Sequence, residues 1–132
     1  MELTRRGTIQ YNLGRFEAAI SDYEFAYERV PAPEILFNLG QCYRHLGDHE
    51  RAVFFFEGYL REVPDASNRS TVEELIAESN DTLLKVDMDA ERKRQQAAIE
   101  QALSANAEKP RKRPVDPGLR QVLLFWLFVV LG

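Results

Sequence analysis

Several features that identify common protein classes are missing from this sequence. Cys42 is the single cysteine among 132 residues, which excludes an internal disulfide bond. The net charge of −4 argues against nucleic acid as the main partner. No apolar run follows the first six residues, so no secretory signal peptide is visible. The hydrophobic fraction of 45% and the length allow one domain with a modest core, plus tails.

Residues suited to catalysis or metal binding are also few. Cys42, His45 and His49 have a spacing that resembles half a zinc site, but no second pair of ligands occurs elsewhere. There is no glycine-rich phosphate-binding loop, and no nucleophile, base and orienting residue form a recognisable set. We therefore predict a protein without a catalytic residue, a bound metal or a cofactor.

What the sequence does contain is an internal repeat with a spacing of 33 residues. A period of this size is typical of a helix-turn-helix solenoid unit, which buries its apolar face by stacking on a neighbouring unit. The repeat predicts an all-α fold with four helices in two hairpins between Met1 and about Asp65. The matching pairs are Gly7 and Gly40, Leu13-Gly14 and Leu46-Gly47, Ala19 and Ala52, Tyr23 and Phe56, and Val30-Pro31 and Val63-Pro64.

The second copy resembles the tetratricopeptide repeat at most of the marked positions of that family. The first copy resembles it less closely, because Arg6 and Gln10 replace apolar or aromatic residues. The resemblance covers about half of the chain and implies two repeats, at residues 1–32 and 33–65, that form a non-catalytic protein-binding module. The residues that carry it are Leu36, Leu39-Gly40, Tyr43, Gly47, Ala52, Phe56 and Pro64.

The resemblance further implies a concave groove, lined by the first helix of each hairpin, that receives a peptide or a partner helix. Asn38 and Gln41 would hydrogen-bond an extended backbone, and Arg5 and Arg44 would meet a carboxylate. The alternative is an ordinary solvated helix face. In the same register Cys42 is a buried small residue. The predicted partner-binding residues are Arg5, Tyr11, Asn12, Phe37, Asn38, Gln41, Arg44 and His45, with Thr4, Thr8 and Glu34 at further groove positions.

Two aromatic residues, Phe54 and Phe55, occupy positions where the first repeat has Ser21 and Asp22. Because Phe56 faces the core, we expect its two neighbours to point around the helix toward the surface. Exposed adjacent aromatic rings indicate contact with another chain or with the fifth helix.

Residues 66–107 are predicted to form a covering helix followed by a polar helical arm. Ser70 to Glu73 have the pattern of a capping box at a helix start. Tetratricopeptide arrays often end in an extra helix that covers the last repeat, and the resemblance implies that role here. The expected apolar stripe consists of Val72, Leu75, Ile76, Leu83 and Val86.

The last part of the sequence joins a basic, proline-rich linker at residues 108–121 to a hydrophobic segment at 122–132. Ten apolar residues supply roughly 15 Å of helix, about half of what a membrane span needs. The segment could be a truncated membrane anchor, an interfacial anchor beside the basic linker, or a buried core element. The residues predicted to contact lipid are Lys109, Arg111, Lys112, Arg113 and Trp126.

Taken together, the sequence resembles short bacterial tetratricopeptide proteins with a C-terminal hydrophobic segment. We predict a protein–protein interaction module, tethered to a membrane through its C-terminus, with the basic linker on the cytoplasmic face if Met1 is the true start. An export signal missing from the sequence would place it in the cell envelope instead. The alternative is a soluble, cytoplasmic, self-associating scaffold that uses the exposed aromatic residues and the apolar tail as subunit contacts.

Overall fold

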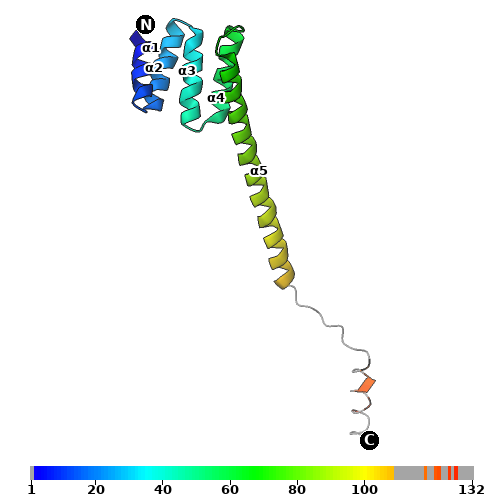
Figure 1. The fold of residues 1–132 in the computed structure, drawn as a ribbon. Coiled ribbons are helices and arrows are strands. Elements are labelled where there is room, and N and C mark those ends of the chain that lie inside the picture. Colours follow the sequence, from blue (N-terminus) through cyan, green and yellow to red (C-terminus); the bar gives the residue numbers. More distant parts are fainter. Residues whose placement is uncertain (1, 109–117, 119–120, 123–124, 126, 128–132) are drawn as a thin grey trace. The chain divides into compact units, whose positions relative to one another are not determined.

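The computed structural model describes residues 2–108 together with Gly118, Gln121, Val122, Phe125 and Leu127 (Figure 1). The described part is all-α and contains no strand, which confirms the predicted fold class. Four helices form two hairpins, and a much longer helix follows them. The helices are α1 (Glu2–Asn12), α2 (Phe16–Arg29), α3 (Pro33–His45), α4 (His49–Glu62) and α5 (Arg69–Glu108).

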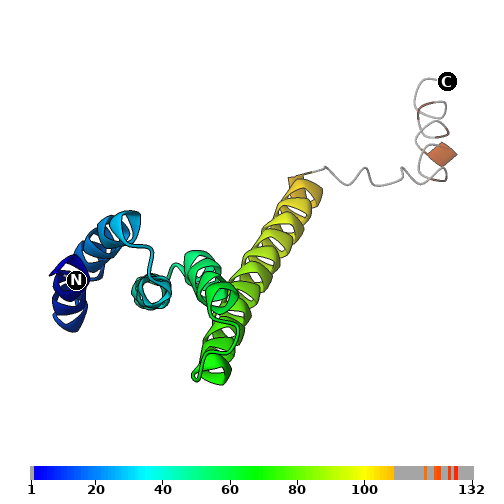
Figure 2. The same ribbon diagram turned by 90° about the horizontal axis from the view of Figure 1, so that it is seen from above.

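The chain divides into two compact units, Met1–Arg92 and Lys93–Gly132. The first unit holds α1 to α4 and the beginning of α5, which lie side by side in chain order (Figures 1 and 2). In the second unit every residue whose surroundings the structure describes is exposed. Within the described residues, no helix combines the length and the hydropathy needed to cross a membrane.

The turns of the two hairpins each contain a glycine with a positive φ angle. Gly14 and Gly47 have φ angles of 71° and 77°, a region that only glycine enters without strain. In the second hairpin Asp48 then caps α4, because its side chain accepts a hydrogen bond of 3.1 Å from the backbone N–H of Arg51. Arg15 occupies the equivalent position before α2 and makes no side-chain cap. The second repeat therefore has the better defined turn.

The core of each hairpin is built around a glycine that faces an aromatic ring. A Cβ atom on Gly7 would lie 2.7 Å from the ring of Tyr23, and one on Gly40 would lie 2.6 Å from the ring of Phe56. These distances are too short for any side chain, so glycine lets the two helices of a hairpin approach closely. The 33-residue repeat thus reproduces the same close contact twice.

Helix α5 packs its N-terminal part on the second repeat, as the resemblance implied. Val72 is fully buried in the same core cluster as Phe56, and Leu75 and Ile76 pack against that cluster. The hydroxyl of Tyr59 donates a hydrogen bond of 2.9 Å to Oδ1 of Asn68 just before the helix. The two hairpins and the start of α5 therefore share one core.

Two details of the predicted α5 are wrong. The helix begins at Arg69, so Ser70 lies inside its first turn rather than at a capping position. The apolar stripe ends at Leu83, because Val86 is 61% exposed. Ser79 lies on the buried face instead, with 1% exposure, and its hydroxyl has no hydrogen-bond partner among the described residues.

The first repeat is less buried than its sequence pattern predicts. Ile9 is 47% exposed, whereas the equivalent Cys42 is fully buried. The reason is that α2 packs against α3, while no helix of the described residues precedes α1. Arg6, which replaces an apolar residue of the pattern, forms an ion pair of 3.3 Å with Asp22. The first repeat thus has an ion pair at the two positions where the second repeat has Leu39 and Phe55.

Candidate functional site

A pocket of ≈590 Å³ lies between the N-terminal parts of α1 and α3, the two helices predicted to line the binding groove, and it is called the groove pocket below. The apolar part of the wall comes from α1, the C-terminal end of α2 and the start of α3. The lining residues are Glu2, Leu3, Thr4, Arg5, Thr8, Ala26, Arg29, Val30, Ala32 and Ile35.

The charges around this groove pocket are mainly positive. Arg5 and Arg29 contribute two guanidinium groups against the single carboxylate of Glu2. Arg5 and Glu2 are both about three-quarters exposed and lie 3.9 Å apart, a separation and exposure at which an ion pair contributes little. Arg29 lies over the ring of Phe25, with 3.3 Å from its guanidinium carbon to the ring centre. The pocket therefore offers two cationic groups to a ligand.

Thr8 links the groove to the core of the first repeat. Its hydroxyl donates a hydrogen bond of 3.0 Å to the Thr4 carbonyl and shares one of 3.1 Å with the hydroxyl of Tyr23. Burial raises the pKa of Tyr23 above its ordinary value, with the Thr8 hydrogen bond acting in the opposite direction. The wall of the groove is thus held by the same tyrosine that packs against Gly7.

An aromatic cluster joins the C-terminal ends of α1 and α3 to the start of α2. Tyr11 and His45 join the two helices through a hydrogen bond of 3.0 Å between the tyrosine hydroxyl and Nε2 of the histidine. Phe16 stacks on the ring of His45 at 4.6 Å and meets Tyr11 edge-on at 5.5 Å. Tyr11 and His45, two of the predicted partner-binding residues, therefore contact each other.

The other predicted binding residues of α3 lie on two different faces of the helix. Gln41 accepts a hydrogen bond of 3.2 Å from Nε of Arg44, so these two side chains lie together on one face of the helix. Phe37 lies 5.8 Å from the ring of Phe56 and 5.6 Å from that of Tyr59, between α3 and α4. Phe37 is thus part of the packing of the second repeat. Asn38 is half-buried and Asn12 is exposed.

Sequence reasoning did not single out Phe16, Arg29, Val30 and Ile35 as functional residues. Phe16 could have been found, because it starts the second helix of its hairpin and is replaced by His49 in the next repeat. Val30 and Ile35 gave no such signal. They contribute to the pocket because the connection between α2 and α3 places them beside α1.

Cys42 has the environment of a packing residue. Burial raises the pKa of its thiol from the ordinary 9.0 to about 11. No group of three potential metal ligands occurs among the described residues. Nδ1 of His49 is buried without a hydrogen-bond partner there, while His45 stacks on Phe16.

Of the two adjacent aromatic residues of α4, Phe54 is exposed and Phe55 is partly buried. Phe55 stacks on Tyr43 of α3 at 5.4 Å with nearly parallel rings, and Phe54 meets Phe55 edge-on at 5.2 Å. Phe54 remains 61% exposed. The pair therefore faces the side of α4 next to α3, and the predicted contact with the fifth helix is not made by these rings.

The tetratricopeptide repeat family model matches residues 4–67. This match spans both hairpins except Glu2 and Leu3, and it includes the aromatic cluster. The chain is a tetratricopeptide repeat protein. Repeats of this family generally mediate protein–protein interaction and are typically non-catalytic. No curated protein matches the chain.

The predicted lipid-contacting residues lie outside the part of the chain that the structure describes. These residues are Lys109, Arg111, Lys112, Arg113 and Trp126. Val122, Phe125 and Leu127 of the hydrophobic segment are described, and all three are exposed.

Proposed function

We propose that the tetratricopeptide groove binds an extended peptide that carries acidic residues around an apolar side chain. The observation that supports this most directly is the pocket between α1 and α3. Its Leu3, Val30 and Ile35 provide an apolar wall, and Arg5 and Arg29 provide positive charge beside it. A carboxylate of the ligand would pair with a guanidinium group while an apolar side chain fills the pocket.

The length of the groove agrees with a short peptide. From Ile35 to Arg44, α3 rises roughly 14 Å, a distance that about four extended residues cover. Asn38 lies one turn beyond the pocket, and Gln41 and Arg44 follow along the same helix. Their side chains offer amide and guanidinium groups to a backbone or a second carboxylate.

A nuclear magnetic resonance titration tests this proposal. The probe is the blocked peptide acetyl-Glu-Glu-Phe-Glu-Glu-amide, added to the ¹⁵N-labelled chain. We expect chemical-shift changes at Thr4, Arg5, Thr8 and Ile35, and at least tenfold weaker binding for Arg5→Glu, which corresponds to about 1.4 kcal/mol.

Lys85→Glu is the matched control, because it makes the same change of charge on an exposed residue of α5. A second variant, Asn38→Ala with Arg44→Ala, tests the rest of the groove and should weaken binding without lowering the urea midpoint of unfolding. Shift changes that avoid α1 and α3, or equal affinity in Arg5→Glu, would show that the binding surface is elsewhere.

We further propose that the chain is tethered at a membrane through residues 122–131, with the basic linker on the cytoplasmic side. The support is the apolar sequence of this segment next to Lys109, Arg111, Lys112 and Arg113. The full chain should sediment with vesicles of phosphatidylserine and phosphatidylcholine, and deletion of residues 122–132 should abolish this.

Lys112→Glu with Arg113→Glu should weaken vesicle binding, while Lys85→Glu should not. The rival proposal is a soluble self-associating scaffold. It gains support if the full chain leaves vesicles unbound and the deletion converts an oligomer into a monomer in sedimentation velocity.

A further inference from the structure

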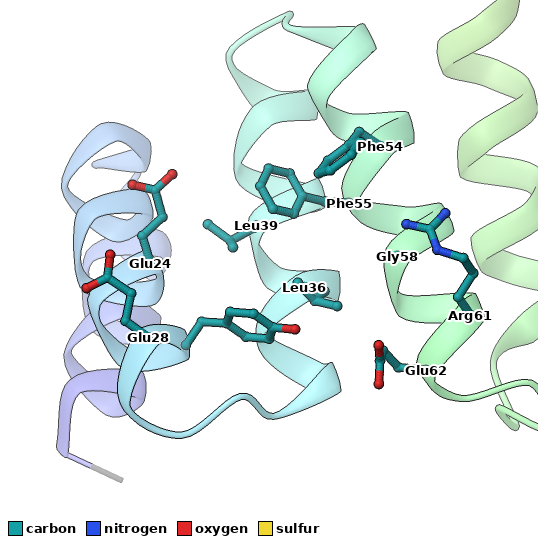
Figure 3. A pocket seen from close by; sticks show the side chains of 10 residues that line it. Glu24, Glu28, Leu36, Leu39, Phe54, Phe55, Gly58, Arg61 and Glu62 are labelled. Carbon is teal, nitrogen blue, oxygen red and sulfur yellow. The ribbon is translucent and has the colours of Figure 1, made fainter.

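A second pocket lies on the side of the repeats formed by α2 and α4, and the predicted groove residues take no part in it. Its volume is ≈390 Å³, and its floor is made by Leu36 and Leu39 of α3 (Figure 3). We propose that this outer pocket binds an apolar side chain of a partner peptide whose neighbouring residues are lysine or arginine. The remaining lining residues are Glu24, Tyr27, Glu28, Phe54, Phe55, Gly58, Arg61 and Glu62.

The apolar character of the outer pocket belongs to the second repeat alone. Leu39 and Phe55 lie in it, whereas the equivalent residues of the first repeat, Arg6 and Asp22, form an ion pair. Phe54 likewise replaces a serine of the first repeat. Leu39 and Phe55 also pack in the core of the second repeat, whereas the packing of the repeat does not require an aromatic ring at the position of Phe54.

The exposure of Phe54 to water is explained by a role in binding. Its side chain is 61% exposed, although Phe55 beside it is held by stacking on Tyr43. An aromatic ring left in water contributes little to folding, but the same ring gains free energy when a ligand covers it. In Figure 3, Phe54 and Phe55 lie at one end of the pocket above Leu39.

The charge around the pocket selects the ligand. Glu24 and Glu28 of α2 lie on one side and Glu62 of α4 on the other, against the single cation of Arg61 (Figure 3). None of these four side chains forms an ion pair with a residue that the structure describes. Their field therefore remains available to a cationic partner.

One of these carboxylates is also held in place. The hydroxyl of Tyr43 donates a hydrogen bond of 3.3 Å to Oε1 of Glu24, and the ring of Tyr43 stacks on Phe55. Glu24 is thus connected to the aromatic wall of the pocket. A lysine or arginine of the ligand can meet this carboxylate and lie over an aromatic face, while the adjacent apolar side chain enters between Leu36 and Leu39.

The two pockets of the repeats therefore differ in sign. Two guanidinium groups against one carboxylate surround the groove pocket, and three carboxylates against one guanidinium surround the outer pocket. Peptides of opposite charge should separate the two sites, so that binding at either site is measured independently of the other.

The experiment is a titration of the ¹⁵N-labelled chain with acetyl-Lys-Lys-Phe-Lys-Lys-amide, followed by nuclear magnetic resonance. We expect shift changes at Leu36, Phe54, Gly58 and Glu62, with none at Thr8. Raising the salt concentration from about 0.02 M to about 0.5 M should weaken binding severalfold, because the Debye length then shortens to a few ångströms.

Two variants test whether the basic peptide binds in the outer pocket. Phe54→Ser introduces the residue of the first repeat at an exposed position and should weaken binding at least fivefold, while Glu28→Lys should weaken it at least tenfold. Phe25→Ser, which alters an exposed aromatic residue of α2 outside the pocket, and Glu17→Lys, which makes the same change of charge as Glu28→Lys on another exposed residue of α2, are the controls and should leave the affinity unchanged.

The proposal is overturned if the acidic peptide causes the same shifts at the outer pocket, if Phe54→Ser binds as tightly as the unaltered chain, or if no shift appears at Leu36 and Gly58. Circular dichroism of each variant establishes that the helices are retained, so a loss of binding reports on the pocket itself.

Discussion

The ring of Phe56 lies directly over the Cα atom of Gly40. A Cβ atom added to this glycine would lie 2.6 Å from Cδ1 of the ring, and Phe56 itself is completely buried. The ring packs in the same core cluster as Ala52 and Val72, so moving it would disturb other buried residues. The glycine that weakens α3 as a helix former is therefore what allows α3 and α4 to form a hairpin.

Gly40→Ala is expected to lower the free energy of unfolding by about 2 kcal/mol, since overpacking of the core exceeds the gain in helix propensity. Gly58→Ala is the matched control. Its Cβ would lie 3.6 Å from Leu36, an ordinary contact, so the better helix former should stabilise by about 0.5–1 kcal/mol. Urea unfolding of both variants measures the two opposite shifts. Equal shifts would contradict the role given to Phe56.

The first repeat lacks the side-chain helix cap that Asp48 provides in the second repeat, and a substitution can introduce it. The backbone angles of Arg15 (φ −93°, ψ 68°) nearly equal those of Asp48 (φ −84°, ψ 77°), yet only Asp48 accepts a hydrogen bond from its helix. Arg15→Asp should therefore raise the free energy of unfolding by about 1 kcal/mol, and Asp48→Ala should lower it by a similar amount. Thermal unfolding followed by circular dichroism measures both. A destabilised Arg15→Asp would show that the two turns are not equivalent.

Two valines of α5 have the same chemistry and opposite environments. Val72 is fully buried in the core of the repeats, while Val86 is 61% exposed. Val72→Ala should cost about 1–3 kcal/mol of unfolding free energy, because it removes buried methyl groups and leaves a cavity. Val86→Ala should change it by less than about 0.5 kcal/mol. Chemical denaturation distinguishes them, and a large effect of Val86→Ala would mean that the apolar stripe continues beyond Leu83.

The buried thiol of Cys42 makes stability depend on pH in the alkaline range. Its pKa rises from the ordinary 9.0 to about 11 on folding. Above about pH 9 the unfolded chain loses this proton while the folded chain keeps it. The stabilisation is therefore complete below pH 9 and is lost as the pH rises toward 11.

We expect the free energy of unfolding, measured with urea, to fall between pH 8 and pH 10 by about 1 kcal/mol more in the unaltered chain than in Cys42→Ala. The tyrosines are present in both proteins, so their titration cancels in the comparison. Equal slopes would indicate that Cys42 is accessible to water in the folded chain.

Helix positions and turns could be predicted because they depend on local sequence. Gly14 and Gly47 terminate their helices by adopting positive φ, and Asp48 caps the next helix. Prediction failed where burial depends on a neighbouring helix. Ile9 and Cys42 are equivalent in the repeat, but only Cys42 has a helix packed over it.

The candidate binding surface was predictable only in part. The repeat register placed Arg5 on the groove helix, and Arg5 does line the groove pocket. It also placed Tyr11 and His45 there, but these side chains hydrogen-bond to each other, and Phe16 stacks on His45. Whether a side chain faces a ligand or another side chain depends on residues distant in sequence, which a single helix pattern does not contain.

The amino-acid sequence by itself determined the two hairpins, their turns and the glycine–aromatic pairs, because each of these recurs at a fixed spacing along the chain. The tertiary structure alone decided where the pockets open and which charges surround them. Val30 and Ile35 meet Arg5 only after α3 packs beside α1, and Glu24 reaches Tyr43 only after α2 packs on α3. Local spacing specifies helices, whereas a binding surface forms between helices whose residues are brought together by folding.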